Sequence, residues 1–307
     1  MRVAILFTDG VGVGPRDPVS NPLTQAQYLL SQFADGSGTT LPGGGARHDV
    51  DTTFGVAGRP QSASNQTAIF TGRPAPSLLG RHVLGYPNEP LRGLLAAHSI
   101  VRKVTEAGRS ATFANSYPAA YLDALGLRRR PSEGADILIP PRFLRRLKAS
   151  ASTLAMSAGG VELRTLDDAR NDEGLTHDVD GSSAMRRRLV VPLRSPEQAA
   201  AIFWKLSADL TLFEHYLADE AGHAQDLALA QKALATFDAF ARAVIDHRPA
   251  DCQVLICSDH GNVEDLSTRG HTRNPVAVLS FGGAPLPPMQ TVADVGAASL
   301  QLLGVAA

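Results

Sequence analysis

The chain has 307 residues, of which 44% are hydrophobic and 19% charged, and its formal net charge is −1. This much apolar material excludes intrinsic disorder, and the length suits one large domain or two smaller ones. The sequence contains no run of about 18 apolar residues, so no membrane span is predicted. The first apolar run ends at Asp9, too early for a secretory signal. The near-zero charge gives no reason to expect nucleic acid as a partner. We therefore expect a cytoplasmic protein, with two cysteines as reduced core thiols.

Four apolar runs predict strands that are buried on both faces, and helical patterns lie between or after them. The predicted strands are 3–8, 209–219, 253–259 and 276–281, and the predicted helices are 195–206, 221–247 and 292–304. Strands that alternate with helices indicate an α/β fold, with a mainly parallel central sheet sandwiched by helices. Residues 35–61 read as a long loop, and loops of that length are usually functional.

The middle of the chain differs from its flanks in charge and composition. Residues 76–207 hold 19 Lys and Arg against 13 Asp and Glu, whereas the remainder holds 10 basic and 17 acidic residues. The near-neutral total is thus a cancellation between a basic middle and an acidic remainder. Three arginine clusters contribute to the basic charge of the middle. Each cluster either faces a functional site or belongs to a solvated surface. They are Arg128, Arg129 and Arg130; Arg142, Arg145 and Arg146; and Arg186, Arg187 and Arg188.

Six Asp and His side chains lie next to the predicted strands. They are Asp9, Asp219, His223, Asp259, His260 and His271. Ligands of open α/β sheets bind outside the carboxyl ends of the strands, and three of the four segments that carry these residues follow a strand. Taken alone, each segment is more typical of a turn, a cap or a surface pair. Together they are enough for two divalent metal ions with open positions, and carboxylate with imidazole suits Zn²⁺ or Mn²⁺.

Ser62 begins a predicted helix whose N-terminal amides can bind an anion. A serine beside a metal ion can lose its proton and attack phosphorus. The alternative is that Ser62 or Ser64 only caps this helix.

These motifs, in this order, resemble the alkaline phosphatase superfamily and, within it, the branch of cofactor-independent phosphoglycerate mutase and phosphopentomutase. The run DHGNVE at 259–264, followed by HTRNPV at 271–276, is similar to the C-terminal signature of that branch. DGVG at 9–12 resembles its N-terminal metal motif, and DEAGH at 219–223 matches the D-x-x-G-H of the superfamily. Ser62 stands ten residues before Gly72, as the nucleophile of the superfamily does before its T-G or A-G ending.

The resemblance implies a role for each matching residue. Asp9, Ser62, Asp259 and His260 would hold one metal, and Asp219, His223 and His271 would hold the other. Ser62 would be the nucleophile of a phosphoserine intermediate, with the metals clamping the attacking and leaving oxygens. Residues 1–75 and 195–307 would form the catalytic core, and 76–194 an inserted cap or substrate region. Asn65, Arg73 and His177 are candidate substrate contacts.

The sequence thus predicts a two-metal phosphoryl-transfer enzyme that hydrolyses a small phosphate monoester, with neither nucleic acid nor membrane as a partner. A small cap offers few means to retain and reorient an intermediate, which favours hydrolysis over an intramolecular phosphomutase acting on phosphoglycerate or a sugar phosphate. A phosphodiesterase, phosphonate hydrolase or sulfatase is a further alternative, although the residues after Ser62 lack the Pro and Arg of a sulfatase motif. A binding module or a metal-stabilised scaffold is disfavoured, because all six Asp and His are present. The substrate, the choice between Zn²⁺ and Mn²⁺ and the oligomeric state stay open.

Overall fold

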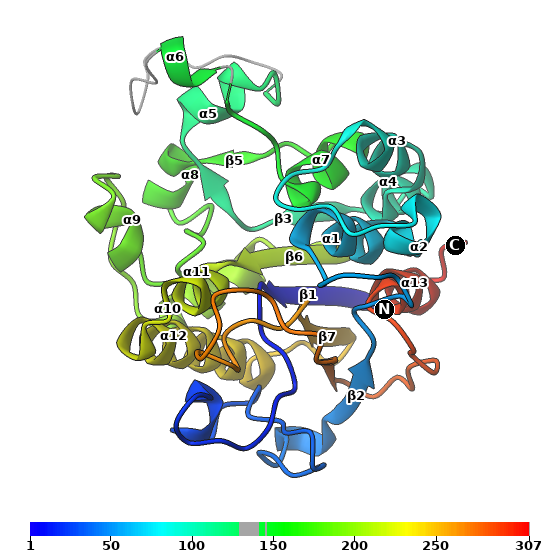
Figure 1. Ribbon diagram of the computed structural model, residues 1–307. Coiled ribbons are helices and arrows are strands. Elements are labelled where there is room, and N and C mark those ends of the chain that lie inside the picture. The colour runs from blue at the N-terminus through cyan, green and yellow to red at the C-terminus, as the bar shows by residue number, and fades with distance from the viewer. Residues whose placement is uncertain (129–140, 145, 307) are drawn as a thin grey trace.

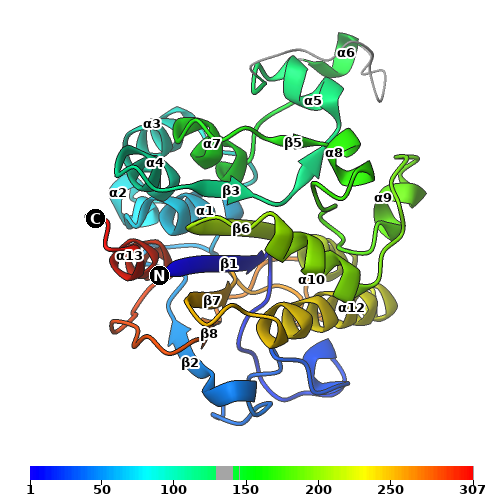
Figure 2. The same cartoon turned by 180° about the vertical axis from the view of Figure 1, so that it is seen from behind.

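The computed structural model describes residues 1–128, 141–144 and 146–306, which form a central sheet between two layers of helices (Figures 1 and 2). The strands of this sheet lie in the order β2-β8-β7-β1-β6-β3. Their bounds are β1 Arg2–Thr8, β2 Ala46–Val50, β3 Ala111–Phe113, β6 Leu210–His215, β7 Cys252–Cys257 and β8 Val276–Phe281. A second, two-stranded sheet pairs β4 (Ser116–Tyr117) with β5 (Arg164–Thr165). The predicted α/β fold with a mainly parallel sheet is confirmed.

The direction of the strands brings the motif-bearing loops to one edge of the sheet. β1 pairs in parallel with β6 on one side and with β7 on the other, so the loops that follow these three strands lie together. β8 runs antiparallel to β7. The loop that precedes β8 therefore reaches the same edge as the loop that follows β7.

Alternate side chains of β1 fill two separate cores, one on each face of the sheet. Ala4 and Leu6 belong to the core formed with α10, α11 and α12, and Val3, Ile5 and Phe7 to the core formed with α1, α3, α4, α7 and α13. Burial on both faces explains the unbroken apolar run of this strand. The helices are α1 Ser62–Thr71, α2 Ala75–Leu79, α3 Glu89–His98, α4 Ile100–Glu106, α5 Ala119–Ala124, α6 Pro141–Leu144, α7 Ala151–Ala158, α8 Leu166–Arg170, α9 Ser182–Arg186, α10 Pro196–Lys205, α11 Leu217–Ala224, α12 Leu227–Asp246 and α13 Ala293–Leu303, with 3₁₀ turns at Pro22–Thr24 and Pro42–Gly44.

Two predicted elements have different bounds in the structure. The strand expected over 209–219 ends at His215, and α11 begins two residues later, so Asp219 lies in the first turn of a helix. The helix expected over 221–247 is broken, because Gln225 adopts a left-handed conformation and the Asp226 side chain caps α12 by accepting from the Leu229 amide. An apolar run of this kind is ambiguous between helix and strand, which is why the first boundary was wrong.

The range 35–61, expected as a loop, contains edge strand β2, which pairs antiparallel with β8. Its sequence, Ala-Arg-His-Asp-Val, has polar residues on an exposed edge and so lacks the apolar signal of the inner strands.

The range 76–194 contributes both to the core layers and to the carboxyl edge of the sheet. β3 pairs with β6 in the central sheet, and buried residues of α3, α4 and α7 pack on its face. The division of the chain expected at residue 76 stays a prediction. Figure 1 shows α8 and α9 near the carboxyl end of β6. Among the described residues, no helix is long and apolar enough to cross a membrane.

Candidate active site

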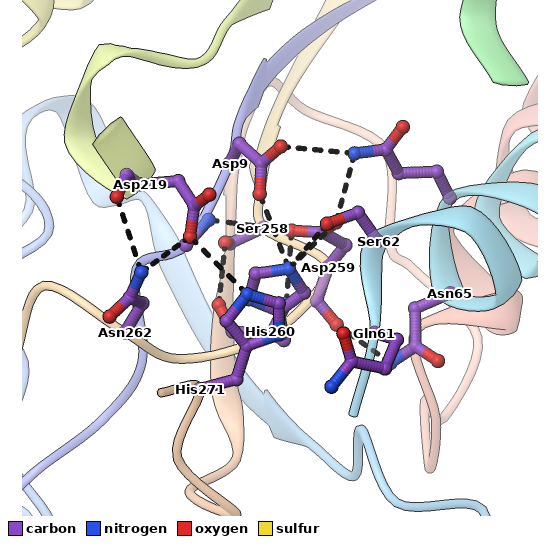
Figure 3. A network of polar contacts seen from close by, with 12 residues as sticks. Asp9, Gln61, Ser62, Asn65, Asp219, Ser258, Asp259, His260, Asn262 and His271 are labelled. Atoms are coloured by element: carbon purple, nitrogen blue, oxygen red, sulfur yellow. Dashed lines mark hydrogen bonds and ion pairs between the residues drawn. The ribbon is translucent and has the colours of Figure 1, made fainter. Parts of the chain in front are cut away.

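The carboxyl edge of β1, β6 and β7 carries two groups of side chains that could each hold a metal ion. Asp9 follows β1 directly, and its amide donates to the His215 carbonyl at the end of β6 (2.8 Å). Asp259 and His260 follow β7 at the same level, and α11 presents Asp219 and His223 after β6. Figure 3 shows Asp9, Asp219, Asp259 and His260 pointing toward one another between the strand edge and the start of α1.

The first group consists of Asp9, Asp259 and His260, all of them buried. His260 Nε2 lies 3.4 Å from a carboxylate oxygen of Asp9 and 3.4 Å from one of Asp259. Burial raises the pKa of Asp9 well above its usual range, and the charges of Asp259 and Asp219 add to this effect. Asp9 Oδ1 makes no hydrogen bond within the described part of the chain. A buried carboxylate pair with an unsatisfied oxygen is a donor set that a divalent cation would complete.

The second group consists of Asp219, His223 and His271. His223 Nδ1 lies 2.7 Å from the Arg269 carbonyl, and His271 Nδ1 lies 2.7 Å from the Pro60 carbonyl. Since a carbonyl only accepts, each Nδ1 donates its hydrogen there, which leaves both Nε2 atoms directed at Asp219, as histidine ligands usually are.

The second group attracts positive charge. The hydrogen bond to Asp219 raises the pKa of His223 to about 9. Burial alone would raise the pKa of Asp219, but hydrogen bonds from His223 and Asn262, together with the charge of His260, lower it to about 2. Burial lowers the pKa of His271 to about 4, so its imidazole is neutral at pH 7. The Asp219 carboxylate and the neutral His271 imidazole are in the protonation state that a metal site requires, and a metal ion would take the place of the proton on His223. The rings of His260 and His271 stack with their centroids 3.7 Å apart, which joins the two groups.

Ser62 is the first residue of α1, and its hydroxyl lies 2.9 Å from His260 Nε2. The N-cap of this helix is Gln61, and no side chain caps it. Ser64 instead donates to the Gln61 carbonyl and accepts from the Val83 amide. The interpretation of Ser62 as a helix cap is therefore not supported: its hydroxyl is directed at the first group.

Gln66 is a site residue that the sequence analysis missed. Its Nε2 donates to Asp9 Oδ2 (3.1 Å) and to Asp259 Oδ2 (3.0 Å), and so bridges the two carboxylates of the first group. The available signal was its spacing, because Gln66 lies one helical turn after Ser62 and so on the same face of α1.

Glu264 ties together the three loops that carry the site. It is buried and accepts hydrogen bonds from the amides of Gly12 (3.0 Å) and Asn262 (2.7 Å). Its other oxygen accepts from the Thr272 hydroxyl and the Asn274 side chain. A Cβ on Gly12 would lie 2.3 Å from Glu264 Oε1, so this close approach requires a glycine. The DGVG and DHGNVE motifs are therefore coupled through one carboxylate.

We expect Glu264→Gln to lower the free energy of unfolding by about 2 to 3 kcal/mol, because an amide nitrogen would face backbone donors in a buried site. Denaturant unfolding followed by circular dichroism measures the change. The matched control is Glu106→Gln, since Glu106 is 59% exposed and forms an ion pair on the surface with Arg102 one turn earlier. Equal losses in the two variants would contradict the role given to Glu264.

The substrate contacts expected from Asn65 and Arg73 stay predictions, and neither residue belongs to a metal-ligand group. Asn65 is fully buried, and its amide nitrogen donates to the carbonyls of Thr52 and Asp259, so it positions the start of α1. Arg73 follows the carboxyl end of α1, about 15 Å along the helix from Ser62 at 1.5 Å per residue, and is exposed. Proximity in sequence suggested these contacts, but the helix carries Arg73 away from the site.

His177 lies outside both metal-ligand groups and lines a separate cavity beside Glu214. Of the arginine clusters, Arg187 pairs with Glu220, which follows Asp219 on α11. Arg128 pairs with Asp123, whereas Arg142, Arg146, Arg186 and Arg188 are exposed. Arg129, Arg130 and Arg145 lie outside the described residues.

The C-terminal part of the chain, residues 197–307, matches the family model described as Metalloenzyme superfamily. This range contains Asp219, His223, Asp259, His260 and His271, but neither Asp9 nor Ser62. No curated protein matches the chain in sequence.

Solved alkaline phosphatases share the fold over almost the whole chain. The enzyme of the Antarctic bacterium TAB5 is 13% identical, with a TM-score of 0.56, and the match covers 99% of this chain and 98% of that one. The cold-active enzyme of Shewanella sp. is 15% identical, with a TM-score of 0.55, over 99% and 100% of the two chains. The enzyme of Thermus thermophilus is 10% identical, with a TM-score of 0.56, over 100% and 92%. The expected alkaline phosphatase-like fold is confirmed, and residues 197–307 are similar to the Metalloenzyme superfamily.

Proposed function

Since the C-terminal part of the chain matches the Metalloenzyme superfamily and the whole chain has the alkaline phosphatase fold, we propose that it is a metal-dependent phosphatase. Its substrate would be a small phosphate monoester, which it hydrolyses through a phosphoserine on Ser62. The family and the fold support a metal-dependent phosphoryl-transfer enzyme; the reaction, the substrate and the residue roles are our proposal.

The observation that carries the proposal is the position of the Ser62 hydroxyl. It lies at the first residue of a buried helix, 2.9 Å from His260 Nε2, where the helix N-terminus meets a group of buried carboxylates and imidazoles. A nucleophile in that place faces a donor set for a cation on one side and helix amides that favour an anion on the other.

Each reaction cycle makes and breaks one bond to Ser62. In the first step Ser62 Oγ releases its proton to solvent and forms a bond to phosphorus, the ester P–O bond breaks, and the alcohol leaves with a proton taken up from solvent. In the second step water attacks the phosphoserine, inorganic phosphate leaves, and the Ser62 hydroxyl regains a proton. Gln66 holds the Asp9 and Asp259 carboxylates in place during both steps, and Asn262 holds Asp219 with a 2.6 Å hydrogen bond.

Asp9, Asp259, His260 and Ser62 would hold one divalent ion, and Asp219, His223 and His271 the other. Bound there, Zn²⁺ or Mn²⁺ would lower the pKa of the serine hydroxyl and offset the charge of the phosphoryl oxygens. The carboxylate and imidazole donors suit both ions.

Hydrolysis is favoured over an intramolecular mutase reaction because much of the range 76–194 belongs to the core layers. The other described elements of that range (β4, β5, α5, α6, α8 and α9) are short, which disfavours a domain that retains and reorients a phosphorylated intermediate. We propose that its elements at the carboxyl edge, including α8 and α9, form the substrate side of the site.

The test is a screen of phosphomonoesters, phosphodiesters and sugar phosphates with Mn²⁺ or Zn²⁺, scored for phosphate release and for isomerisation. We expect metal-dependent phosphate release from monoesters. Isomerisation of a sugar phosphate without phosphate release would identify the mutase alternative, and activity on diesters alone would contradict the proposal.

A further inference from the structure

A cavity of about 580 Å³ lies next to the candidate active site, between the end of β6 and the elements β4, α5 and α9. This volume falls within the range of roughly 300–1,000 Å³ that is typical of small-molecule sites. Neither metal-ligand group contributes to its walls, so the proposed chemistry leaves its purpose unexplained.

Aromatic rings form a continuous wall of this cavity. The rings of Tyr117 and Tyr121 stack at 5.8 Å, His177 meets Tyr117 edge-on at 4.9 Å, and Tyr216 follows His177 at 5.1 Å. Burial lowers the pKa of His177 to about 4, so its ring is neutral at pH 7 and behaves as a further aromatic surface. Such rings offer faces and edges on which another planar ring gains attraction beyond area burial.

The polar groups of the cavity are few and mostly acidic or neutral. Glu214 is buried at the end of β6, and Ser152 donates to one of its oxygens (2.7 Å). The Ser116 hydroxyl is buried in the cavity wall and has no hydrogen-bond partner in the part of the chain that the structure describes. Arg187 at the rim is already paired with Glu220 (2.5 and 2.8 Å). A second phosphate or carboxylate group would meet acidic residues here with no uncommitted arginine among the described lining residues.

The cavity adjoins the edge of the sheet that carries Ser62 and the metal-ligand groups. Glu214 stands opposite Phe7 in the β1–β6 register and points to the same face, where Phe7 contacts Phe70 of α1. Glu214 directly precedes His215, whose carbonyl accepts a hydrogen bond from the Asp9 amide (2.8 Å). On the other side, Glu220 lines the cavity and directly follows Asp219.

We propose that this cavity binds the organic part of the substrate, and that this part is an uncharged aromatic or heteroaromatic group joined to the phosphate through an ester oxygen. This inference rests on the proposed function and deepens it, because it names the substrate class. A planar group stacks on the tyrosine and histidine rings, and a hydrogen-bond donor on it reaches Glu214. Polar atoms of the ring pair with the otherwise unsatisfied Ser116 hydroxyl.

The test compares 2-naphthyl phosphate with ethyl phosphate on the full chain loaded with Zn²⁺ or Mn²⁺, and measures binding of 2-naphthol directly by calorimetry. In Tyr121→Leu we expect the KM for naphthyl phosphate to rise about tenfold and naphthol affinity to fall by a similar factor. The KM for ethyl phosphate should stay within about twofold of the wild-type value. Tyr216→Leu should change the same KM value and the naphthol affinity in the same direction, and it replaces Tyr121→Leu in the test if that variant fails to fold.

The matched control is Tyr28→Leu, which removes a tyrosine ring from the core on the other face of the sheet. It should leave the ratio of the two KM values unchanged. The inference would be overturned if the protein released phosphate from both esters but did not bind naphthol, or if Tyr121→Leu and Tyr28→Leu had equal effects. Either result would leave the proposed function intact. Naphthol binding that depends on Tyr121, with no phosphate release from any ester, would overturn the proposed function and keep the cavity as an aromatic binding site.

Discussion

Replacing Ser62 by Ala should reduce the turnover of phosphate esters by at least about a thousandfold, because it removes the oxygen that would attack phosphorus. The fold should survive, since Ser62 is not the N-cap of α1. Among the described residues, its hydroxyl is hydrogen-bonded to His260. Phosphate release under saturating substrate measures the rate, and thermal unfolding by circular dichroism checks the fold. In the wild-type protein, acid quenching during turnover of radiolabelled substrate should trap phosphate on the chain, whereas Ser62→Ala should trap none.

The control for this prediction is Ser64→Ala, two residues further along the same helix. The Ser64 hydroxyl is buried and bonds to the Gln61 carbonyl and the Val83 amide, so its loss should cost about 1 kcal/mol of unfolding free energy. Turnover should remain within a few fold of the wild-type rate. Retained hydrolysis of an aryl phosphate by Ser62→Ala, or trapped phosphate in that variant, would place the nucleophile elsewhere.

The metal-ligand groups could be predicted because their motifs are tied to strand ends. Asp9 and Asp259 follow apolar runs that are buried on both faces, and parallel neighbours bring such ends together. His271 precedes its strand in the sequence, and the antiparallel direction of β8 is what returns it to the same edge. The sequence pattern identified His271 as a candidate ligand but carried no information about the direction of β8.

The supporting contacts could not be predicted, since they depend on how separate elements pack. Gln66 reaches Asp9 and Asp259 only because α1 lies against the carboxyl ends of both β1 and β7. Arg73 follows Ser62 by eleven positions in a segment that looked like one motif, and the length of α1 separates them. The aromatic cavity joins Tyr117, His177 and Tyr216, which are distant in sequence and carry no periodic signal.

Removing one ligand from each metal-ligand group should separate the two sites. We expect the wild-type protein to bind one divalent ion at each group, and His271→Ala to lose the ion of the second group while keeping that of the first. Asp259→Asn should do the reverse, because its carboxylate belongs to the first group alone. Metal content after gel filtration, measured by mass spectrometry, gives the stoichiometry of each variant.

Stability provides a second readout of the same prediction that does not require activity. Asp9 and Asp259 are buried carboxylates, and burial together with the charge of Asp259 raises the pKa of Asp9, so a bound cation should stabilise the folded state. At a free metal concentration 100 times the dissociation constant, each ion adds about 2.7 kcal/mol, which a chelator should remove. His271→Ala should lose only part of this metal-dependent stabilisation. His98→Ala is the matched control, since His98 lies at the end of α3 outside both groups, and it should keep both ions. Two bound ions in both His271→Ala and Asp259→Asn would contradict the assignment of ligands, and chelator-treated protein with full activity would contradict the mechanism.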